Sequence, residues 1–286
     1  MLDPKFAESS QVKGAADITI FSPLNGGPRK ILNGLPQQTD CRKENVKTNV
    51  INTGTDQLLC EVRDGVAVIT LNRPEARNAL GDTLTPALRR MIRDRGQDPE
   101  VGALLLTGSG TAFCAGGDIK GMAAGPSKPI TSEQKVARLR ERQRTLTGTL
   151  RELRKPTIAA LPGPAAGAGL AIALACDIRM AAESTFISTG YAKVGLSGDY
   201  GIAWLLTQII GTARARELMF TADRIYAKEC ERIGLINRVV PDAKLQEESF
   251  AFAQRLADGP TMALEHMKDN LDDALVEPFL SALDGE

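Results

Sequence analysis

The chain has 286 residues, 43% of them hydrophobic, and its 35 Lys and Arg residues balance 35 Asp and Glu residues. Such a chain can bury a sizeable core, and its neutrality argues against nucleic acid or an anionic membrane surface as a partner. Its longest apolar stretches fall far short of the ~20 residues that a membrane span needs, so we expect a soluble, cytoplasmic protein.

Residues 1–55 lack sustained hydrophobic periodicity and are rich in proline and glycine. We interpret them as an extension with little regular structure, neither a transit nor a signal peptide, ahead of one folded domain at 56–286. Residues 58–62 and 66–71 are apolar runs about Asp64-Gly65, which is typical of a β-hairpin. A helix capped by Asp82 should follow. Its apolar face consists of Leu84, Leu88, Met91 and Ile92.

A buried strand at 101–107 leads to adjacent glycines, Gly116 and Gly117, and a loop around 126–129 precedes an amphipathic helix at 132–153. The inner side of that helix is assigned to Val136, Leu139, Leu146, Leu150 and Leu153. The N–H groups of a glycine turn favour an anion, or an oxygen on which negative charge develops. The alternative is an ordinary strand-to-helix connection.

The strand, glycine turn and helix then recur at 155–161, 162–169 and 170–176. Two such units in succession indicate parallel βαβ layers, in which both turns lie at the same edge of the sheet and can face one ligand. A layered α/β region with a helical tail from about residue 243 is the predicted architecture. Its remaining elements are a strand at 177–182, helices at 203–210, 212–221 and 227–233, a strand at 234–240, and helices near 245–256 and 264–275.

The cysteines have no regular spacing, which favours reduced, buried thiols over a disulfide framework. They are Cys41, Cys60, Cys114, Cys176 and Cys230. Cys114 adjoins the first glycine turn, but the only histidine, His266, is remote in sequence, so a Cys-His or Ser-His mechanism has little support. No His/Cys cluster or dinucleotide fingerprint implies a metal or redox cofactor.

Four motifs occur in an order that resembles the crotonase (enoyl-CoA hydratase/isomerase) superfamily over about residues 57–270. They are ITLNRPEARNAL at 69–80, FCAGGDIK at 113–120, KPTIAAL at 155–161 with GAG at 167–169, and AKECERIGLINRVV at 227–240. The resemblance implies a spiral of ββα units with a helical C-terminal trimerisation region. Because the chain stops soon after the helix at 264–275, we expect that region to be shortened and the trimer, or dimer of trimers, to be weakened.

The resemblance also implies acyl-CoA thioester substrates, with CoA as part of the substrate and no separate cofactor. The thioester oxyanion would be held by the backbone N–H groups of Gly117 and Ala168. The residues implied for the CoA contact are Arg77, Ala79, Gly117, Asp118, Ile119 and Lys120. There are alternatives without a role in CoA binding. Arg77 and Lys120 would then be solvated surface residues, and Asp118 would form hydrogen bonds to the backbone of its own loop.

Hydratases of this superfamily resemble one another in two glutamates, and the corresponding residues here are Ala171 and Tyr191. Asp199 matches an acidic position of some enoyl-CoA isomerases, so we expect it to move a proton; the alternative is that it caps the next helix. The predicted activity is double-bond isomerisation or an atypical hydration of an enoyl-CoA. A non-catalytic acyl-CoA-binding or oligomer-forming homologue is the other interpretation.

Overall fold

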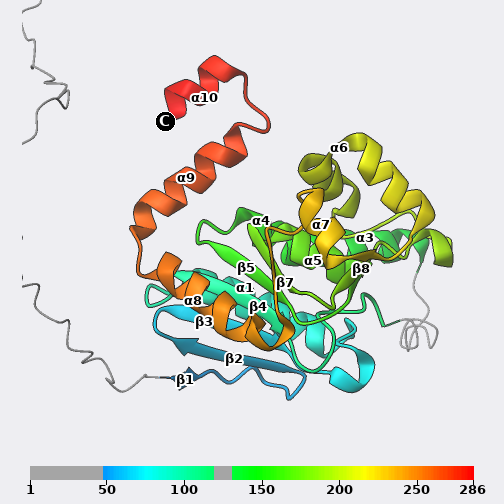
Figure 1. Cartoon of the computed structure of the whole chain (residues 1–286), viewed down its shortest axis with the longest axis horizontal. Coiled ribbons are helices and arrows are strands. Elements are labelled where there is room, and N and C mark those ends of the chain that lie inside the picture. The colour runs from blue at the N-terminus through cyan, green and yellow to red at the C-terminus, as the bar shows by residue number, and fades with distance from the viewer. Residues whose placement is uncertain (1–47, 119–130) are drawn as a thin grey trace, which may run out of the picture. The chain divides into compact units, whose positions relative to one another are not determined.

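A computed structural model describes residues 48–118 and 131–286, with elements labelled in Figure 1. The predicted loop at 126–129, and most of the predicted extension, lie outside these ranges. The strands are β1 (Asn49–Val50), β2 (Leu58–Arg63), β3 (Val66–Leu71), β4 (Ala103–Gly108), β5 (Thr157–Leu161), β6 (Ala165–Ala166), β7 (Ile178–Ala182), β8 (Phe186–Ser188), β9 (Ile225–Tyr226) and β10 (Arg238–Val240). The α-helices are α1 (Leu84–Gly96), α3 (Ser132–Gln143), α4 (Thr149–Glu152), α5 (Ala168–Ala175), α6 (Ile202–Thr221), α7 (Ala227–Arg232), α8 (Leu245–Ala257), α9 (Thr261–Asp273) and α10 (Phe279–Gly285).

The main sheet has the strand order β1-β2-β3-β4-β5-β7-β10. Strands β1 to β3 are antiparallel, whereas β3, β4, β5, β7 and β10 pair in parallel. The predicted hairpin is confirmed: Arg63 pairs with Val66 across Asp64 and Gly65, whose φ angles of 48° and 72° match the twist of the strands. A second sheet has the order β6-β8-β9. The predicted α/β class and parallel layers are therefore confirmed.

Hydrophobic cores cover both faces of the sheet, because neighbouring residues of a strand point to opposite sides. In β4, Leu105 belongs to the core that contains Leu245 and Ala253 of α8, whereas Leu104 and Leu106 belong to the core that includes residues of α1 and α5. Figure 1 shows α8 lying across the face of the sheet opposite α1. This double burial explains why the strands read as continuous apolar runs.

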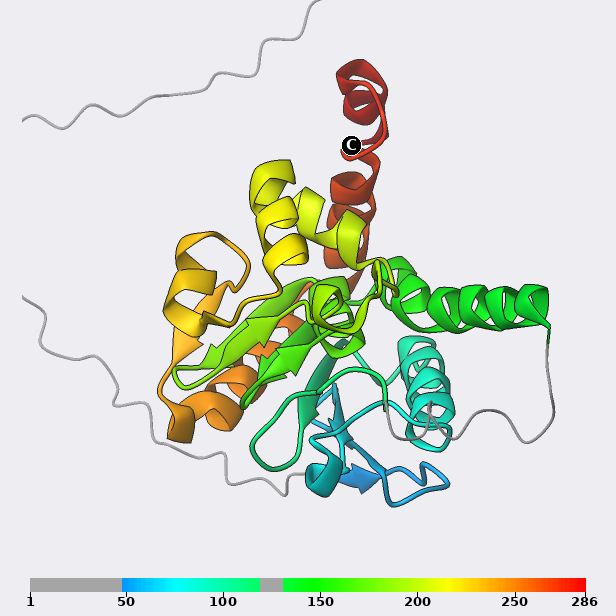
Figure 2. The same cartoon turned by 90° about the vertical axis from the view of Figure 1, so that its right-hand side faces the viewer.

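The predicted helix at 132–153 is interrupted by a π-helical turn, Arg144–Gly148, between α3 and α4. Leu146 and Leu150 are fully buried as expected, but Val136 and Leu139 are 48% and 40% exposed, so their assignment to the inner side was wrong. Figure 2 shows the reason, since α3 extends beyond the sheet and leaves its first turns without a layer to cover them.

One other local prediction changes and another is confirmed. The residue that precedes α1 as its N-cap is Thr83, and Asp82, which was expected to cap this helix, instead lies 3.4 Å from Arg142. The two helices expected at 203–210 and 212–221 are confirmed as the two parts of α6, which meet at a kink at Gly211, whose φ of 74° is not helical.

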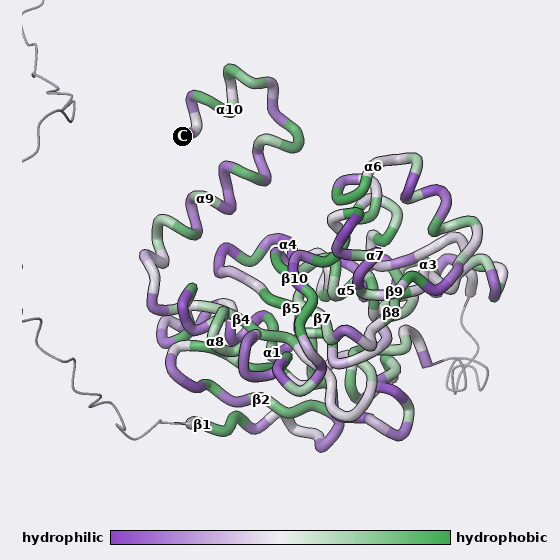
Figure 3. The backbone as a smooth tube through the Cα atoms, in the orientation of Figure 1, coloured by the Kyte–Doolittle hydropathy of each residue, from purple (hydrophilic) through white to green (hydrophobic). Residues whose placement is uncertain are grey.

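The helices predicted near 245–256 and 264–275 form as α8 and α9, and α10 follows them, but many apolar residues of α9 and α10 are exposed. Met267 is 55% exposed and Leu271 70%, and on α10 Phe279 and Leu280 are 77% and 70% exposed. Figure 3 shows hydrophilic and hydrophobic stretches alternating along both helices. No helix of the described residues is long and apolar enough to cross a membrane.

All four cysteines within the described ranges are buried and unpaired, as expected. Burial raises the pKa of the Cys60 thiol to about 11. It raises the pKa of each of the other three to about 12, and these are Cys114, Cys176 and Cys230. Because a thiol with so high a pKa stays protonated near neutral pH, Cys114 is a poor nucleophile.

Candidate active site

The first glycine turn follows β4 and lies directly against the second. Gly116 has a φ of +95°, and a Cβ atom there would lie 2.9 Å from the Ala166 carbonyl oxygen and 3.5 Å from the Ala168 nitrogen. Only glycine permits both the backbone conformation and the close approach. The structure therefore brings together the two turns that were predicted to share one edge of the sheet.

The Gly117 N–H is left available by the pairing of its neighbours. Leu80 donates to the Gly116 carbonyl at 2.7 Å, and its own carbonyl accepts from Asp118 at 2.9 Å. In this parallel bridge the backbone groups of Gly117 point away from Leu80. Among the described residues, no hydrogen bond uses the Gly117 N–H.

The second turn places Ala168 at the start of α5. Ala166 donates to the Cys114 carbonyl at 2.9 Å, and Gly167 donates to Ser188 at 3.1 Å, so both sides of the turn are fixed. The first N–H groups of a helix have no partner within it, and within the described ranges the Ala168 N–H has none elsewhere. Two backbone donors thus stand at adjoining turns, which is the arrangement that a developing oxyanion requires.

The Asp199 carboxylate accepts a 2.5 Å hydrogen bond from the Tyr191 hydroxyl. Tyr191 is 5% exposed, and its Cζ atom lies 4.0 Å from the position of a Cβ on Gly167, so the phenol borders the second turn. The alternative that Asp199 caps α6 is wrong, since Gly201 is the N-cap residue and no side chain caps this helix. Asp199 contributes to α6 only through its carbonyl, which accepts from Ile202 at 3.1 Å.

Burial raises the pKa of Asp199 above its usual 3.8, while the hydrogen bond from Tyr191 lowers it. Burial, and then the contact with Asp199, raise the pKa of Tyr191 well above 10. The proton between the two oxygens therefore belongs to the phenol, and the carboxylate is its acceptor. Ala171, at the other position where hydratases have a glutamate, is fully buried and offers no titratable group.

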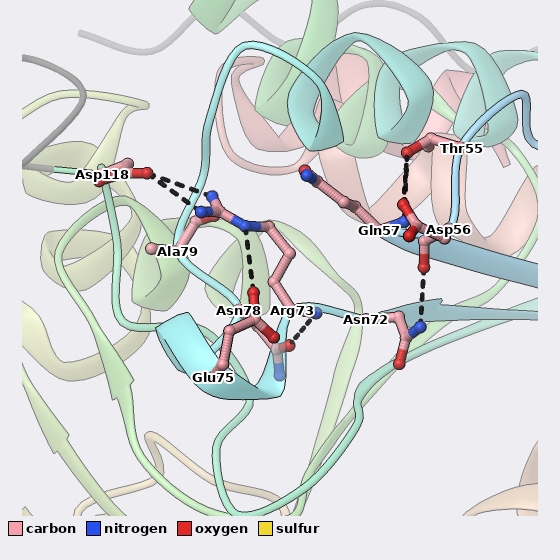
Figure 4. A network of polar contacts seen from close by, with 9 residues as sticks. All are labelled: Thr55, Asp56, Gln57, Asn72, Arg73, Glu75, Asn78, Ala79 and Asp118. Atoms are coloured by element: carbon pink, nitrogen blue, oxygen red, sulfur yellow. Dashed lines mark hydrogen bonds and ion pairs between the residues drawn. The ribbon is translucent and has the colours of Figure 1, made fainter.

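An ion pair between Arg73 and Asp118 supports the first turn, and sequence reasoning missed it (Figure 4). Nη1 and Nη2 of Arg73 lie 3.2 and 3.3 Å from Asp118 Oδ2, and Nη1 also donates to the Ala79 carbonyl at 3.1 Å. The Asp118 side chain is thus paired with a residue 45 positions away, and its expected hydrogen bonding to the backbone of its own loop stays a prediction. The NRP motif and the acidic residue after Gly117 were the available signals.

The other residues of the predicted CoA contact are only partly described. Arg77 is exposed with a left-handed φ of 50°, and its carbonyl accepts from Ala115 at 2.9 Å, which joins the 77–79 loop to the first turn. Ala79 is 8% exposed. Ile119 and Lys120 lie outside the described residues.

Beside these residues, Asn78 was also missed. Its Nδ2 atom donates to the carbonyls of Ser109 and Ala112 at 3.0 and 2.8 Å, and its Oδ1 atom accepts from the Arg73 N–H at 2.8 Å. Three satisfied hydrogen bonds and complete burial identify Asn78 as structural. It holds the loop that carries Arg77 against the end of β4.

Comparison with known proteins agrees with this geometry. The family model described as enoyl-CoA hydratase/isomerase matches residues 61–285. The chain is 36% identical over 226 residues to a probable enoyl-CoA hydratase of Mycobacterium tuberculosis, covering 77% of this chain and 79% of that protein. It is 35% identical over 230 residues to the 1,2-epoxyphenylacetyl-CoA isomerase of Escherichia coli, covering 80% and 87%.

Solved structures give the same result. The crystal structure of a putative enoyl-CoA hydratase from Streptomyces coelicolor is 37% identical and superimposes with a TM-score of 0.75, covering 80% of this chain and 82% of that one. A Pseudomonas aeruginosa protein, also 37% identical, gives a TM-score of 0.74 over 80% of this chain and 96% of its own. The family model and the solved folds lead to one conclusion: this chain belongs to the enoyl-CoA hydratase/isomerase family of the crotonase superfamily.

Proposed function

We propose that this enzyme moves the double bond of an enoyl-CoA, with Gly117 and Ala168 as oxyanion donors and Asp199 as the proton shuttle. The observation that carries the proposal is the Tyr191–Asp199 pair beside the second glycine turn. It joins a half-buried carboxylate to a phenol that borders the turn carrying Gly167 and Ala168. The name of the related 1,2-epoxyphenylacetyl-CoA isomerase is compatible with proton transfer on a CoA thioester, although that name describes a different substrate.

The proposed reaction needs one base and one oxyanion site. Asp199 takes a proton from the α carbon of a 3-enoyl thioester, and the electrons of that C–H bond form a dienolate whose charge rests on the thioester oxygen. Asp199 then returns the proton to the γ carbon, which gives the conjugated 2-enoyl thioester. A positioned general base contributes about 10²–10⁴-fold, and each oxyanion donor about 10²–10³-fold.

Hydration by two glutamates has less support, because Ala171 has no acidic group and Tyr191 is a neutral phenol. The competing proposal is a non-catalytic acyl-CoA-binding homologue, which the same two residues suggest. Incubation with a 3-enoyl-CoA and, separately, with crotonyl-CoA separates the three. If the absorbance of the conjugated thioester rises with the 3-enoyl substrate, isomerisation is supported. If this absorbance falls with crotonyl-CoA, the enzyme is a hydratase. Tight binding without any change in absorbance indicates a non-catalytic homologue.

The variant Asp199→Asn tests the proposed base. The amide keeps the size and can still accept from Tyr191, but it cannot take up a proton, so we expect isomerisation at least ~100-fold slower with unchanged CoA-thioester affinity. Asp223→Asn is the matched control, since Asp223 is exposed and its only ion pair among the described residues, to Lys193, spans 4.0 Å. Isomerisation by Asp199→Asn at the wild-type rate would show that the carboxylate is not the base.

A further inference from the structure

We propose that Tyr191 is a positioning residue, whose hydroxyl holds Oδ1 of the Asp199 carboxylate so that Oδ2 is the oxygen that exchanges the proton with substrate. The inference rests on the proposed function, because it assigns a task to the partner of the proposed base. Tyr191, which stands where the resemblance places a hydratase glutamate, would then support the reaction by orienting the base.

The geometry of the pair supports this task. A 2.5 Å contact is short even for a hydroxyl that donates to a carboxylate, and Oδ1 is the oxygen it reaches. Within the described ranges no group bonds to Oδ2, which leaves that oxygen available to a substrate carbon.

The loop that carries Asp199 does little else to fix the orientation of the Asp199 side chain. Gly198, Tyr200 and Gly201 have φ angles of 120°, 51° and 78°, so the chain around Asp199 is a succession of left-handed residues rather than a helix or strand. In the described part of the chain the Asp199 side chain has one hydrogen bond, the one from Tyr191. Without it the carboxylate is free to rotate, and a misplaced base loses much of its rate advantage.

Tyr191 is anchored where Asp199 is not. Its ring is 5% exposed, it borders Gly167, and its carbonyl accepts from Val194 and Leu196, both at 3.0 Å. The aromatic ring has only two side-chain torsions to fix, so its hydroxyl is a rigid donor. The phenol therefore fixes the position of the Asp199 carboxylate relative to the second glycine turn, which carries the Ala168 N–H.

The pair also predicts a pH profile. Asp199 accepts a proton only when ionised, so activity falls as pH decreases through its pKa, which burial places above 3.8. The bond from Tyr191 acts in the opposite direction and lowers that pKa. In the described part of the chain, Tyr200, with Arg89 and Arg142 near its phenol, is a further titratable group close to Asp199. Removing the Tyr191 hydroxyl should therefore move the acid limb of activity to higher pH.

The test is Tyr191→Phe, which removes one oxygen and keeps the ring. We expect kcat/KM for a 3-enoyl-CoA to fall about tenfold or more, chiefly in kcat, and its acid limb to move to higher pH. Tyr200→Phe is the matched control: this tyrosine is also buried, and its N–H bonds to Gln143 at 2.8 Å, but its hydroxyl does not bond to Asp199. Its acid limb should stay in place.

Two further measurements separate the inference from the proposed function. If Asp199→Asn retains the wild-type rate, Asp199 is not the base and the proposed function is wrong. If Asp199→Asn loses activity while Tyr191→Phe keeps the wild-type rate and the wild-type acid limb of the pH profile, only the role of Tyr191 is overturned. Carboxyl ¹³C NMR titration of the free enzyme needs no substrate. The pKa of Asp199 should be higher in Tyr191→Phe than in the wild type, and an unchanged pKa would overturn the inference.

Discussion

The Nζ atom of Lys268 lies 2.9 Å from Oδ2 of Asp177, an ion pair that attaches α9 to the main sheet. The same carboxylate oxygen accepts from the N–H and the hydroxyl of Thr157, both at 2.8 Å, at the start of β5. Lys268 is 9% exposed, and every other residue of α9 is more exposed than it. This helix is therefore held to the domain by polar contacts more than by a hydrophobic core.

Lys268→Ala should lower the free energy of unfolding by about 2 kcal/mol, because it removes a bond to a charged group and leaves a partly buried carboxylate with fewer partners. Urea denaturation followed by circular dichroism measures the change. Lys244→Ala is the control: Lys244 pairs with Glu247 at 2.9 Å on the surface, where solvent screens the pair, and we expect a clearly smaller loss of stability there. Equal losses in both variants would contradict this account of α9.

Arg73→Met should reduce kcat/KM for an enoyl-CoA about tenfold, because Asp118 would lose the guanidinium that holds it beside Gly117. Arg73→Lys should recover only part of the rate, since an ammonium cannot reach Asp118 and the Ala79 carbonyl with the same fork. Arg93→Met, at a residue that is 61% exposed, serves as the control in the same steady-state assay. Unaltered kinetics in Arg73→Met would show that the ion pair does not position the turn.

Ala168→Pro tests the proposed role of the Ala168 N–H as an oxyanion donor. Proline lacks the N–H yet is tolerated at the first position of a helix, so α5 should still form while isomerisation falls about 10²–10³-fold. Ala168→Gly retains the N–H and should keep most of the activity. Circular dichroism and single-turnover kinetics of the two variants are the measurements. A proline variant that folds and works normally would remove Ala168 from the mechanism.

We predict that deleting residues 1–47 leaves thermal stability and CoA-thioester binding nearly unchanged, because their composition offers little to bury. Deletion through residue 55 should be destabilising, since it removes β1 and Thr53. Thr53 is 5% exposed, and its hydroxyl donates to the Leu58 carbonyl at 2.7 Å. Calorimetric scans of both truncations compare them. Loss of soluble protein on the shorter deletion would show that the extension supports the fold.

We propose that the domain forms homo-oligomers and that α9 and α10 contribute to the contact. Leu271, Phe279 and Leu280 are each at least 70% exposed, an arrangement that favours association. Phe279→Ser with Leu280→Ser should shift sedimentation velocity profiles toward the monomer at micromolar concentration. Phe220→Ser, at a residue of α6 that is 75% exposed, is the control. An unchanged distribution in the double variant would place the contact elsewhere.

The sequence predicted the parts of this site that depend on local backbone chemistry. Paired glycines after an apolar strand located the turn at Gly116 and Gly117, and the recurrence of that pattern located the turn at 162–169. The resemblance to the crotonase superfamily then singled out Ala168 within that second turn. Contacts between segments that are distant in the sequence were harder to predict. The Arg73–Asp118 pair spans 45 positions, and the Tyr191–Asp199 bond crosses a loop of left-handed residues that has no hydrophobic period.

The same limit explains the misplaced helix face. Helical periodicity identifies which residues share a side, as it did for Leu146 and Leu150, but not whether another layer covers that side. Val136 and Leu139 continue the pattern into α3, where the sheet no longer lies beneath them. A single sequence contains no signal for the point at which the layer ends.

Because the thiols of this domain are buried, their oxidation or alkylation depends on local opening of the fold. Cys114 packs against Gly169, where a Cβ would lie only 2.7 Å from its sulfur atom, so no alkylating or oxidising reagent reaches it without separation of the two glycine turns. A thiolate is the species that reacts, and burial suppresses it at every cysteine within the described ranges. Thiol modification there consequently follows transient opening of the backbone, and its rate at Cys114 reports how often the two glycine turns separate.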